Sequence, residues 1–239
     1  MITVNNLDAG YGKLVVLHDV SMTFEADKFT TILGANGSGK STLLKSIMGL
    51  TTIVAGSVTF DGRELVGMAT ESISDLGIAY VPQRENIFDA MSVRENLQLA
   101  ARRMSKDEAR RALHETYDLF PILAKRQSQR AGQLSGGERQ MVAIAIGWLS
   151  RPRLMILDEP SAGLAPLVAK EVFEVLRILV EKNITMIVVE QNARRAIKYC
   201  DYVYVLRSGE VAFNGTAEAC LANEEMVKTY LSLGRVENT

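Results

Sequence analysis

The sequence predicts an α/β protein, in which helices cover both faces of a parallel sheet and a helical subdomain is inserted into the chain. Its 239 residues are 47% hydrophobic and 23% charged, ordinary values for a folded domain. In the final third, apolar strands alternate with helical stretches, which is typical of a parallel sheet. Helix-forming residues dominate the middle of the chain, which indicates the insertion.

The first third of the chain is expected to form strands. Val20–Phe24 alternates apolar and polar residues, the period of a half-buried strand. Val58–Phe60 leads into Asp61 and Gly62, a pair typical of turns. Phe29–Leu33 is β-branched and apolar, and a glycine-rich loop ends it. We therefore expect Phe29–Leu33 to be a buried strand of the parallel sheet.

The middle segment is expected to be helical from Ser92 to about Leu123, and Ser105 with Glu108 forms the capping box of one helix. We place the inserted subdomain at approximately residues 84–145 of a single domain that spans 1–239. The last third is predicted to contain, in order, a strand at 154–157, a helix at 167–180, a strand at 184–189 and a helix at 193–199.

Composition disfavours several other classes of protein. Lysine and arginine total 27 against 28 acidic residues, so the chain shows no basic excess of the kind that nucleic-acid binders carry. Two cysteines, Cys200 and Cys220, are too few for a disulfide framework and indicate reduced thiols. Neither a secretory signal nor an apolar run of membrane-spanning length is found. We expect a cytoplasmic protein.

A phosphate-binding loop is the clearest motif. Gly34–Ser41 fits G-x-x-x-x-G-K-[ST] and lies between a predicted strand and a predicted helix. Lys40 is expected to reach the β- and γ-phosphates and Ser41 to hold Mg²⁺, while backbone N–H groups and the helix N-terminus surround phosphate oxygens. The predicted ATP contacts in this segment are Gly34, Ala35, Asn36, Gly37, Ser38, Gly39, Lys40, Ser41 and Thr42.

Two acids end the apolar strand at 154–157. From the carboxyl end of a buried strand, Asp158 can reach a Mg²⁺ ion and Glu159 can polarise an attacking water. Acids at a strand end are often only the start of a solvated loop, but the phosphate-binding loop favours the catalytic interpretation. We predict Asp158 as a metal ligand and Glu159 as a catalytic base.

Leu134-Ser135-Gly136-Gly137-Glu138-Arg139-Gln140 resembles the signature motif of ABC transporter ATPases. Tyr-Val-Pro-Gln ending at Gln83 resembles the family's Q-loop, and Ser161–Leu164 its D-loop. The motifs occur in the family's order from Tyr11 to Gln191, across nearly the whole chain. The resemblance implies a P-loop NTPase core of RecA-like type, with an N-terminal antiparallel β subdomain and the inserted helical subdomain.

The same resemblance assigns further residues. Tyr11 is implied as the aromatic platform for adenine, and Gln83 as a contact to both nucleotide and Mg²⁺. It also implies a head-to-tail pair with a second ABC ATPase subunit, identical or homologous. Ser135, Gly136 and Gly137 of one chain would contact the ATP held by the other; their N–H groups precede a predicted helix, a favourable place for an anion.

One position departs from the family pattern. Gln191 follows the last core strand, where the family usually has a switch histidine. An amide can hydrogen-bond a γ-phosphate but cannot carry the charge of a protonated histidine. Gln191 is therefore predicted to be catalytic together with Glu159, with the rate of hydrolysis left open.

Glu190-Gln191-Asn192-Ala193, Gly163-Leu164-Ala165-Pro166 and the segment Met226–Leu231 resemble the LivF-type ATPases of branched-chain amino-acid importers. This implies an ATP-hydrolysing subunit that uses ATP and Mg²⁺, sits on the inner face of the cell membrane through permease subunits, and serves an extracytoplasmic solute-binding protein indirectly. A urea or other small-solute transporter and a low-turnover regulatory nucleotide-binding module remain alternatives. A nucleic-acid-associated ATPase is disfavoured, because the chain has one cassette and only a short insertion.

The segment after Gln83 offers a docking hypothesis. Ile87, Phe88 and Met91 lie in a predicted loop, where they either cover the subdomain's own core or line a groove for a short helix of a pore subunit.

Overall fold

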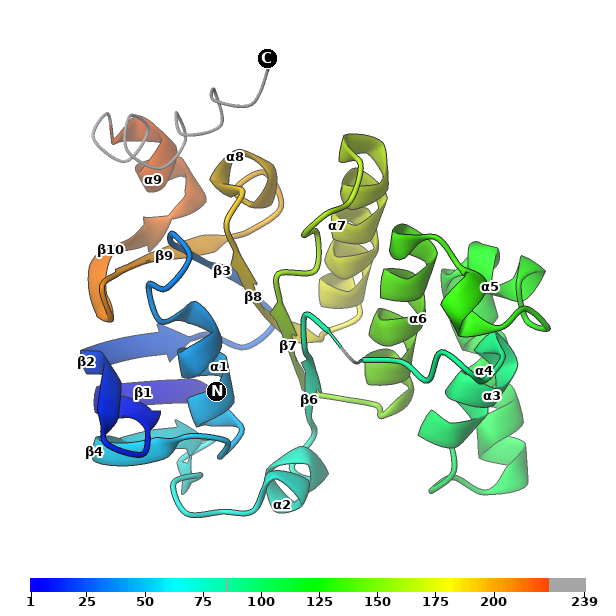
Figure 1. The fold of residues 1–239 in the computed structure, drawn as a ribbon, viewed down its shortest axis with the longest axis horizontal. Helices are drawn as coiled ribbons and strands as arrows, with labels where there is room; N and C mark the ends of the chain where they lie inside the picture. Colours follow the sequence, from blue (N-terminus) through cyan, green and yellow to red (C-terminus); the bar gives the residue numbers. More distant parts are fainter. Residues whose placement is uncertain (85, 224–239) are drawn as a thin grey trace.

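Two sheets organise the protein (Figure 1), whose computed structural model describes residues 1–84 and 86–223. The larger sheet has the strand order β10-β9-β3-β8-β7-β6. Its strands are β3 (Phe29–Leu33), β6 (Ile78–Val81), β7 (Leu154–Asp158), β8 (Thr185–Glu190), β9 (Tyr202–Arg207) and β10 (Glu210–Thr216). All neighbouring pairs are parallel except β9 and β10. The predicted parallel α/β sheet is confirmed.

The smaller sheet is antiparallel and comes from the first 64 residues, in the order β2-β1-β4-β5. Its strands are β1 (Ile2–Tyr11), β2 (Leu14–Phe24), β4 (Thr52–Phe60) and β5 (Arg63–Glu64). Asp61 and Gly62 both adopt positive φ, 50° and 78°, and form the turn between β4 and β5. The N-terminal antiparallel β subdomain and its turn are thus confirmed.

Helices connect and cover the strands. They are α1 (Lys40–Ile47), α2 (Thr70–Asp75), α3 (Val93–Ala100), α4 (Lys106–Leu119), α5 (Pro121–Lys125), the 3-10 turn η1 (Ala131–Gln133), α6 (Gly136–Leu149), α7 (Pro166–Glu181), α8 (Ala193–Ala196) and α9 (Ala217–Ala222). The capping box of Ser105 and Glu108 at α4 is present. Helix α8 ends three residues before the predicted Tyr199, because the chain turns tightly to bring the Asp201 N–H to the Phe29 carbonyl (2.8 Å) and start β9.

The parallel strands separate two apolar cores, which explains why they are apolar on both faces. Ile32, Ile156 and Ile187 pack with α1 and the antiparallel sheet. The next residues, Leu33, Leu157 and Val188, point to the opposite face and pack with α6 and α7. Both cysteines are buried free thiols, and burial raises the pKa of Cys200 to about 11, so this thiol stays protonated at neutral pH.

The chain between β6 and β7 is mainly helical. Helices α3, α4 and α5 all contact α6, which in turn contacts β6 and α7 (Figure 1). Helix α6 approaches the sheet closely at Gly147, where a methyl group would lie 2.8 Å from Met155 Cε and 3.3 Å from Val81 Cγ2. Helix α6 thereby belongs to the sheet core as well as to the helical part, and the boundaries at 84 and 145 stay a prediction.

No helix within 1–84 and 86–223 is long and apolar enough to cross a membrane. The carboxyl ends of β3, β6, β7 and β8 meet at one edge of the sheet, the usual place for a ligand in a parallel α/β fold. The motifs that follow these four strands, which are Gly34–Ser41, Gln83, Asp158 with Glu159, and Gln191, lie along this edge.

Candidate nucleotide-binding site

The glycine-rich loop joins the end of β3 to the start of α1. Gly37 and Gly39 have φ angles of 79° and 102°, a region that side chains disfavour. Gly39 is the N-cap of α1, and no side chain in the described part of the protein caps that helix. The first N–H groups of α1 therefore have no side-chain acceptor, and with the helix dipole they form an anion-binding end.

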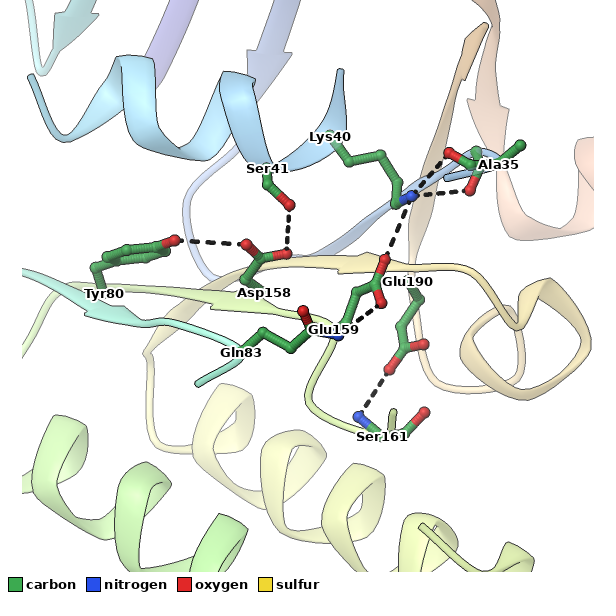
Figure 2. A network of polar contacts seen from close by, with 10 residues as sticks. Ala35, Lys40, Ser41, Tyr80, Gln83, Asp158, Glu159, Ser161 and Glu190 are labelled. Atoms are coloured by element: carbon green, nitrogen blue, oxygen red, sulfur yellow. Dashed lines mark hydrogen bonds and ion pairs between the residues drawn. The ribbon is translucent and has the colours of Figure 1, made fainter. Parts of the chain in front are cut away.

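Lys40 points back over this loop (Figure 2). Its side chain is only 4% exposed, and Nζ donates to the carbonyls of Gly34 (2.9 Å) and Ala35 (3.1 Å). Nζ also lies 3.4 Å from Glu159 Oε1. Ser38 Oγ is buried among the described residues without a hydrogen-bond partner, and a methyl group at Gly34 would collide with it. A buried ammonium and an unsatisfied hydroxyl, next to a glycine that has no room for a side chain, fit a bound phosphate.

Ser41 and Asp158 form the candidate metal end. Ser41 Oγ donates to Asp158 Oδ1 at 3.0 Å, and Tyr80 Oη lies 3.5 Å from Oδ2 (Figure 2). Burial raises the pKa of Asp158, against the hydrogen bond from Ser41. No group of three acidic, histidine or cysteine side chains that could hold a metal exists within the described ranges. The hydroxyl and carboxylate instead suit Mg²⁺, which keeps water and phosphate oxygens among its ligands.

Glu159 stands between the ends of three strands. Its N–H donates to the Val189 carbonyl of β8 (3.0 Å), and its backbone has a positive φ of 45°. Its carboxylate accepts from Gln83 Nε2 at 3.0 Å through Oε2 and faces Lys40 through Oε1 (Figure 2). The structure therefore brings together Lys40, Ser41, Gln83, Asp158 and Glu159, which lie as far as 119 residues apart in the sequence.

Tyr11 and Gln191 lie at the ends of their strands. Tyr11 ends β1, is 44% exposed, and has Lys45 Nζ 5.9 Å from its ring centroid. Gln191 follows β8 directly and is exposed; its carbonyl accepts from the Ala193 N–H (3.0 Å). Because Val189 pairs with Asp158, Gln191 lies at the same sheet edge as the two acids.

Ser135, Gly136 and Gly137 lie at the start of α6, which stands on the other side of β6 and β7 from α1 (Figure 1). They do not join the cluster around Lys40 within this chain. Gly136 instead lines a cavity of about 490 Å³ that it shares with Gln83 and Leu164. Gly137 packs so closely on α7 that a methyl group there would collide with Val168 Cγ1.

Two contacts were not predicted. Tyr80 reaches Asp158, and Glu190 accepts the Ser161 N–H at 3.0 Å through Oε1. Each has a signal in the sequence, since Tyr80 is a polar-tipped residue in an apolar strand and Glu190 follows the apolar run Met186–Val189. Neither partner could be deduced, because Asp158 lies on another strand and Ser161 in the turn that follows that strand.

Residues 17–162 match the family described as ABC transporter. The chain is 39% identical to the high-affinity branched-chain amino acid transport ATP-binding protein BraG of Pseudomonas aeruginosa, covering 97% of this chain and 99% of that one. It is 41% identical to the probable branched-chain amino acid transport ATP-binding protein LivF of Archaeoglobus fulgidus, covering 98% and 99%.

Two solved structures extend the likeness to the fold. One is an ATP-binding cassette of an ABC transporter in its ADP conformation, at TM-score 0.86 and 25% identity, covering 97% of this chain and 98% of that one. The other is a dimeric post-hydrolysis cassette bound to ADP and Pi, at TM-score 0.79 and 25% identity, covering 91% and 99%.

Proposed function

The chain belongs to the ABC transporter family, and from this we propose that it is the ATP-hydrolysing subunit of an importer for branched-chain or related amino acids. The proposal of a substrate class rests on BraG and LivF, whose names state branched-chain amino acid transport and which match this chain over nearly its full length. The resemblance of Glu190–Ala193 and Gly163–Pro166 to this group supports the same class.

In this function the loop from Gly34 to Thr42 holds the phosphates of ATP and Tyr11 stacks on the base. Lys40 exchanges its two carbonyl partners for phosphate oxygens, a gain because an ammonium binds an anion more strongly than a neutral carbonyl. Ser41, Gln83 and Asp158 would hold Mg²⁺, which when bound neutralises phosphate charge. Glu159 accepts the proton of the attacking water, and Gln191 orients toward the γ-phosphate.

The proposed partners are a second ABC ATPase subunit and membrane permease subunits, with a solute-binding protein acting through the permease. The place of Ser135–Gly137, away from the chain's own Lys40, supports a head-to-tail pair in which they approach the ATP of the partner. The dimeric relative bound to ADP and Pi supports pairing.

The observation on which the ATPase function depends most is the cluster of Lys40, Ser41, Asp158 and Glu159. It is tested by phosphate release from the purified chain with Mg-ATP, alone and reconstituted with its permease. Transport is tested by ATP-dependent uptake of leucine and, separately, of urea into vesicles that contain the native complex. Leucine uptake supports the proposed substrate class, urea uptake replaces it, and a chain that binds ATP without turnover with or without permease would be a regulatory module.

The segment after Gln83 carries the docking hypothesis. Ile87 packs against the core and also lines the cavity of about 490 Å³ beside Gln83, so its position supports both interpretations. Phe88 is 57% exposed, and we propose it as a contact to a permease helix. Phe88→Asp should release the protein from membranes that contain its partners while ATP binding and thermal melting are retained. Val54→Asp, which changes a comparably exposed residue (60%) on β4, is the control; full retention of the Phe88 variant on membranes would contradict the proposal.

A further inference from the structure

Glu190 is a buried carboxylate next to the catalytic cluster. It is the last residue of β8 and is 3% exposed. The four residues before it are also buried, but they are all apolar. Burial raises the pKa of Glu190, while its hydrogen bonds with Ser161 and the charge of Arg195 act in the other direction. A carboxyl group is costly to bury, and the strand itself could end in an apolar residue. Glu190 therefore needs an explanation outside the strand.

Its contact is to the turn that carries Glu159. Glu190 Oε1 accepts the N–H of Ser161 at 3.0 Å (Figure 2). Ser161 is itself 2% exposed, and its Oγ accepts from Arg195 Nη1 at 3.2 Å. The backbone of Ser161 is thus held by a side chain of β8, and its hydroxyl by a side chain of α8.

Two hydrogen bonds attach the turn at residues 159–164 to β8. The first is the hydrogen bond from Glu159 N–H to the Val189 carbonyl (3.0 Å), and the second is the carboxylate of Glu190 on Ser161. Between them the chain passes through the positive φ of Glu159, and Ala162 N–H closes the turn onto the Glu159 carbonyl at 3.1 Å. A residue in this region keeps its conformation only when its surroundings fix it on both sides.

We propose that Glu190 is a positioning residue for ATP hydrolysis: by holding Ser161, it fixes the turn that aims Glu159 at Lys40 and Gln83. The inference rests on the proposed ATPase function. Gln191 follows Glu190 directly in the chain. The hydrogen bond between Glu190 and Ser161 therefore connects the segment that carries Gln191 to the turn that carries Glu159. A shift of the β8 end that moves Gln191 therefore also moves the catalytic base.

The test compares Glu190→Leu with Glu190→Gln. Leucine removes the acceptor, so kcat should fall by about 10- to 10²-fold, the scale of a small misplacement of a catalytic group, while ATP affinity changes by less than about 3-fold. Glutamine keeps an oxygen that can accept from Ser161 and should restore kcat to within about 3-fold of the wild type. Equal losses in both variants, or a wild-type kcat in a folded Glu190→Leu protein, would overturn the proposal.

Asp201→Leu is the matched control, because it also removes a side-chain acceptor. Asp201 also accepts a backbone N–H of the same sheet, that of Phe29 (2.8 Å), but at the opposite ends of the parallel strands. It should lower the melting temperature and leave kcat unchanged. If Glu190→Leu does not fold, Arg195→Leu is the second test. It removes the hydrogen bond to the Ser161 hydroxyl and leaves the Ser161 N–H paired with Glu190. It should lower kcat but not ATP affinity, and unchanged kinetics would overturn the inference.

A double variant shows whether Glu190 acts through Glu159. In Glu190→Leu/Glu159→Gln the hydrolysis rate should equal that of Glu159→Gln alone, because the position of residue 159 no longer matters once its carboxylate is removed. If the two rate losses multiply in the double variant, Glu190 does not act through Glu159. A wild-type chain that hydrolyses no ATP, alone or with its permease, defeats the proposed function itself, whereas an active wild type with an indifferent Glu190→Leu defeats only this inference.

Discussion

Helices α1 and α6 both begin within glycine-containing motifs that are predicted to bind phosphate, yet their N-termini differ. The N-cap of α1 is Gly39, and no side chain of the described ranges caps it. The N-cap of α6 is Ser135, whose Oγ accepts the N–H of Glu138 (3.3 Å), while Glu138 Oε2 accepts the N–H of Ser135 (2.9 Å). The start of α6 is thus stabilised by its own chain, and that of α1 is left for a ligand.

The electrostatics of the two ends differ as well. Lys40 adds a buried positive charge at α1, and its Nζ faces Glu159 Oε1 at 3.4 Å. At α6, the hydrogen bond from the Ser135 backbone holds the pKa of Glu138 below its usual range, helped by Arg126, so a carboxylate stands at this end at neutral pH. We therefore expect the first end to bind an anion by itself and the second to add hydrogen bonds to an anion that is already held. The difference fits one chain that binds ATP and a second that completes the site.

The largest expected effect separates binding at α1 from turnover. Glu159→Gln should keep ATP affinity, because Lys40 and the N–H groups of α1 are intact, and slow hydrolysis by about 10² to 10⁴-fold, the usual contribution of a general base. Phosphate release, nucleotide binding and size-exclusion chromatography with Mg-ATP measure rate, affinity and trapped ATP-bound pairs. Glu174→Gln, at an exposed acid paired with Lys170, is the control. Normal turnover in the Glu159 variant would remove Glu159 from the mechanism.

This contrast was only partly predictable from the sequence. Gly34–Ser41, Asp158 and Glu159 could be found because each motif is local and its strand context is visible in the apolar pattern. The capping box of α6 was equally local, since Ser135 and Glu138 have the same spacing as Ser105 and Glu108. It was not predicted, because these residues were interpreted only as part of the signature motif. The contacts of Tyr80 and Glu190 could not be found, because strand order decides which distant residues meet.

The second effect tests whether Ser135, the N-cap of α6, also contributes to ATP hydrolysis. Ser135→Ala and Ser105→Ala remove the same capping box from α6 and α4, and each should cost about 0.5–2 kcal/mol of stability, seen in thermal melting. Only Ser135→Ala should also lower the ATPase rate, by about 10-fold, the value of one or two hydrogen bonds. The ATP affinity of the isolated Ser135→Ala chain should equal that of the wild type.

A loss of ATP affinity in the isolated Ser135→Ala chain would contradict the assignment of α6 to the partner's nucleotide. Equal ATPase rates in the two variants would reduce the start of α6 to a structural cap.

The third effect concerns Gln191 on the α1 side. Gln191→Ala should lower kcat by about 5-fold, near the value of one neutral hydrogen bond, and leave ATP affinity almost unchanged, because the contact matters mainly in the transition state. Steady-state kinetics and nucleotide titration separate the two. Unchanged kinetics would make Gln191 a bystander, and faster turnover in Gln191→His would show that the amide limits the rate at this end.

The smallest effect tests the charge at α6. Arg126 Nε lies 3.1 Å from Glu138 Oε1, and the pair is partly exposed (48% and 18%). Such pairs contribute about 0.2–1 kcal/mol to stability, so Arg126→Ala should lower the melting temperature only slightly. Glu138 would keep its hydrogen bonds from Ser135 but lose the cation that balances it. A phosphate that approaches α6 would then meet an uncompensated carboxylate.

The ATPase rate of Arg126→Ala should therefore fall about 2-fold at low salt and recover as salt is raised, since ions screen repulsion between partly exposed charges. Arg103→Ala removes another surface ion pair, with Asp75 of α2, which is more exposed (73% and 60%), and its rate should not change relative to wild type at any salt concentration. Measuring both variants from about 20 to 300 mM salt decides the question. A defect in Arg126→Ala that is independent of salt would mean that Arg126 positions the helix mechanically, and the distinction between the two N-termini would then rest on capping alone.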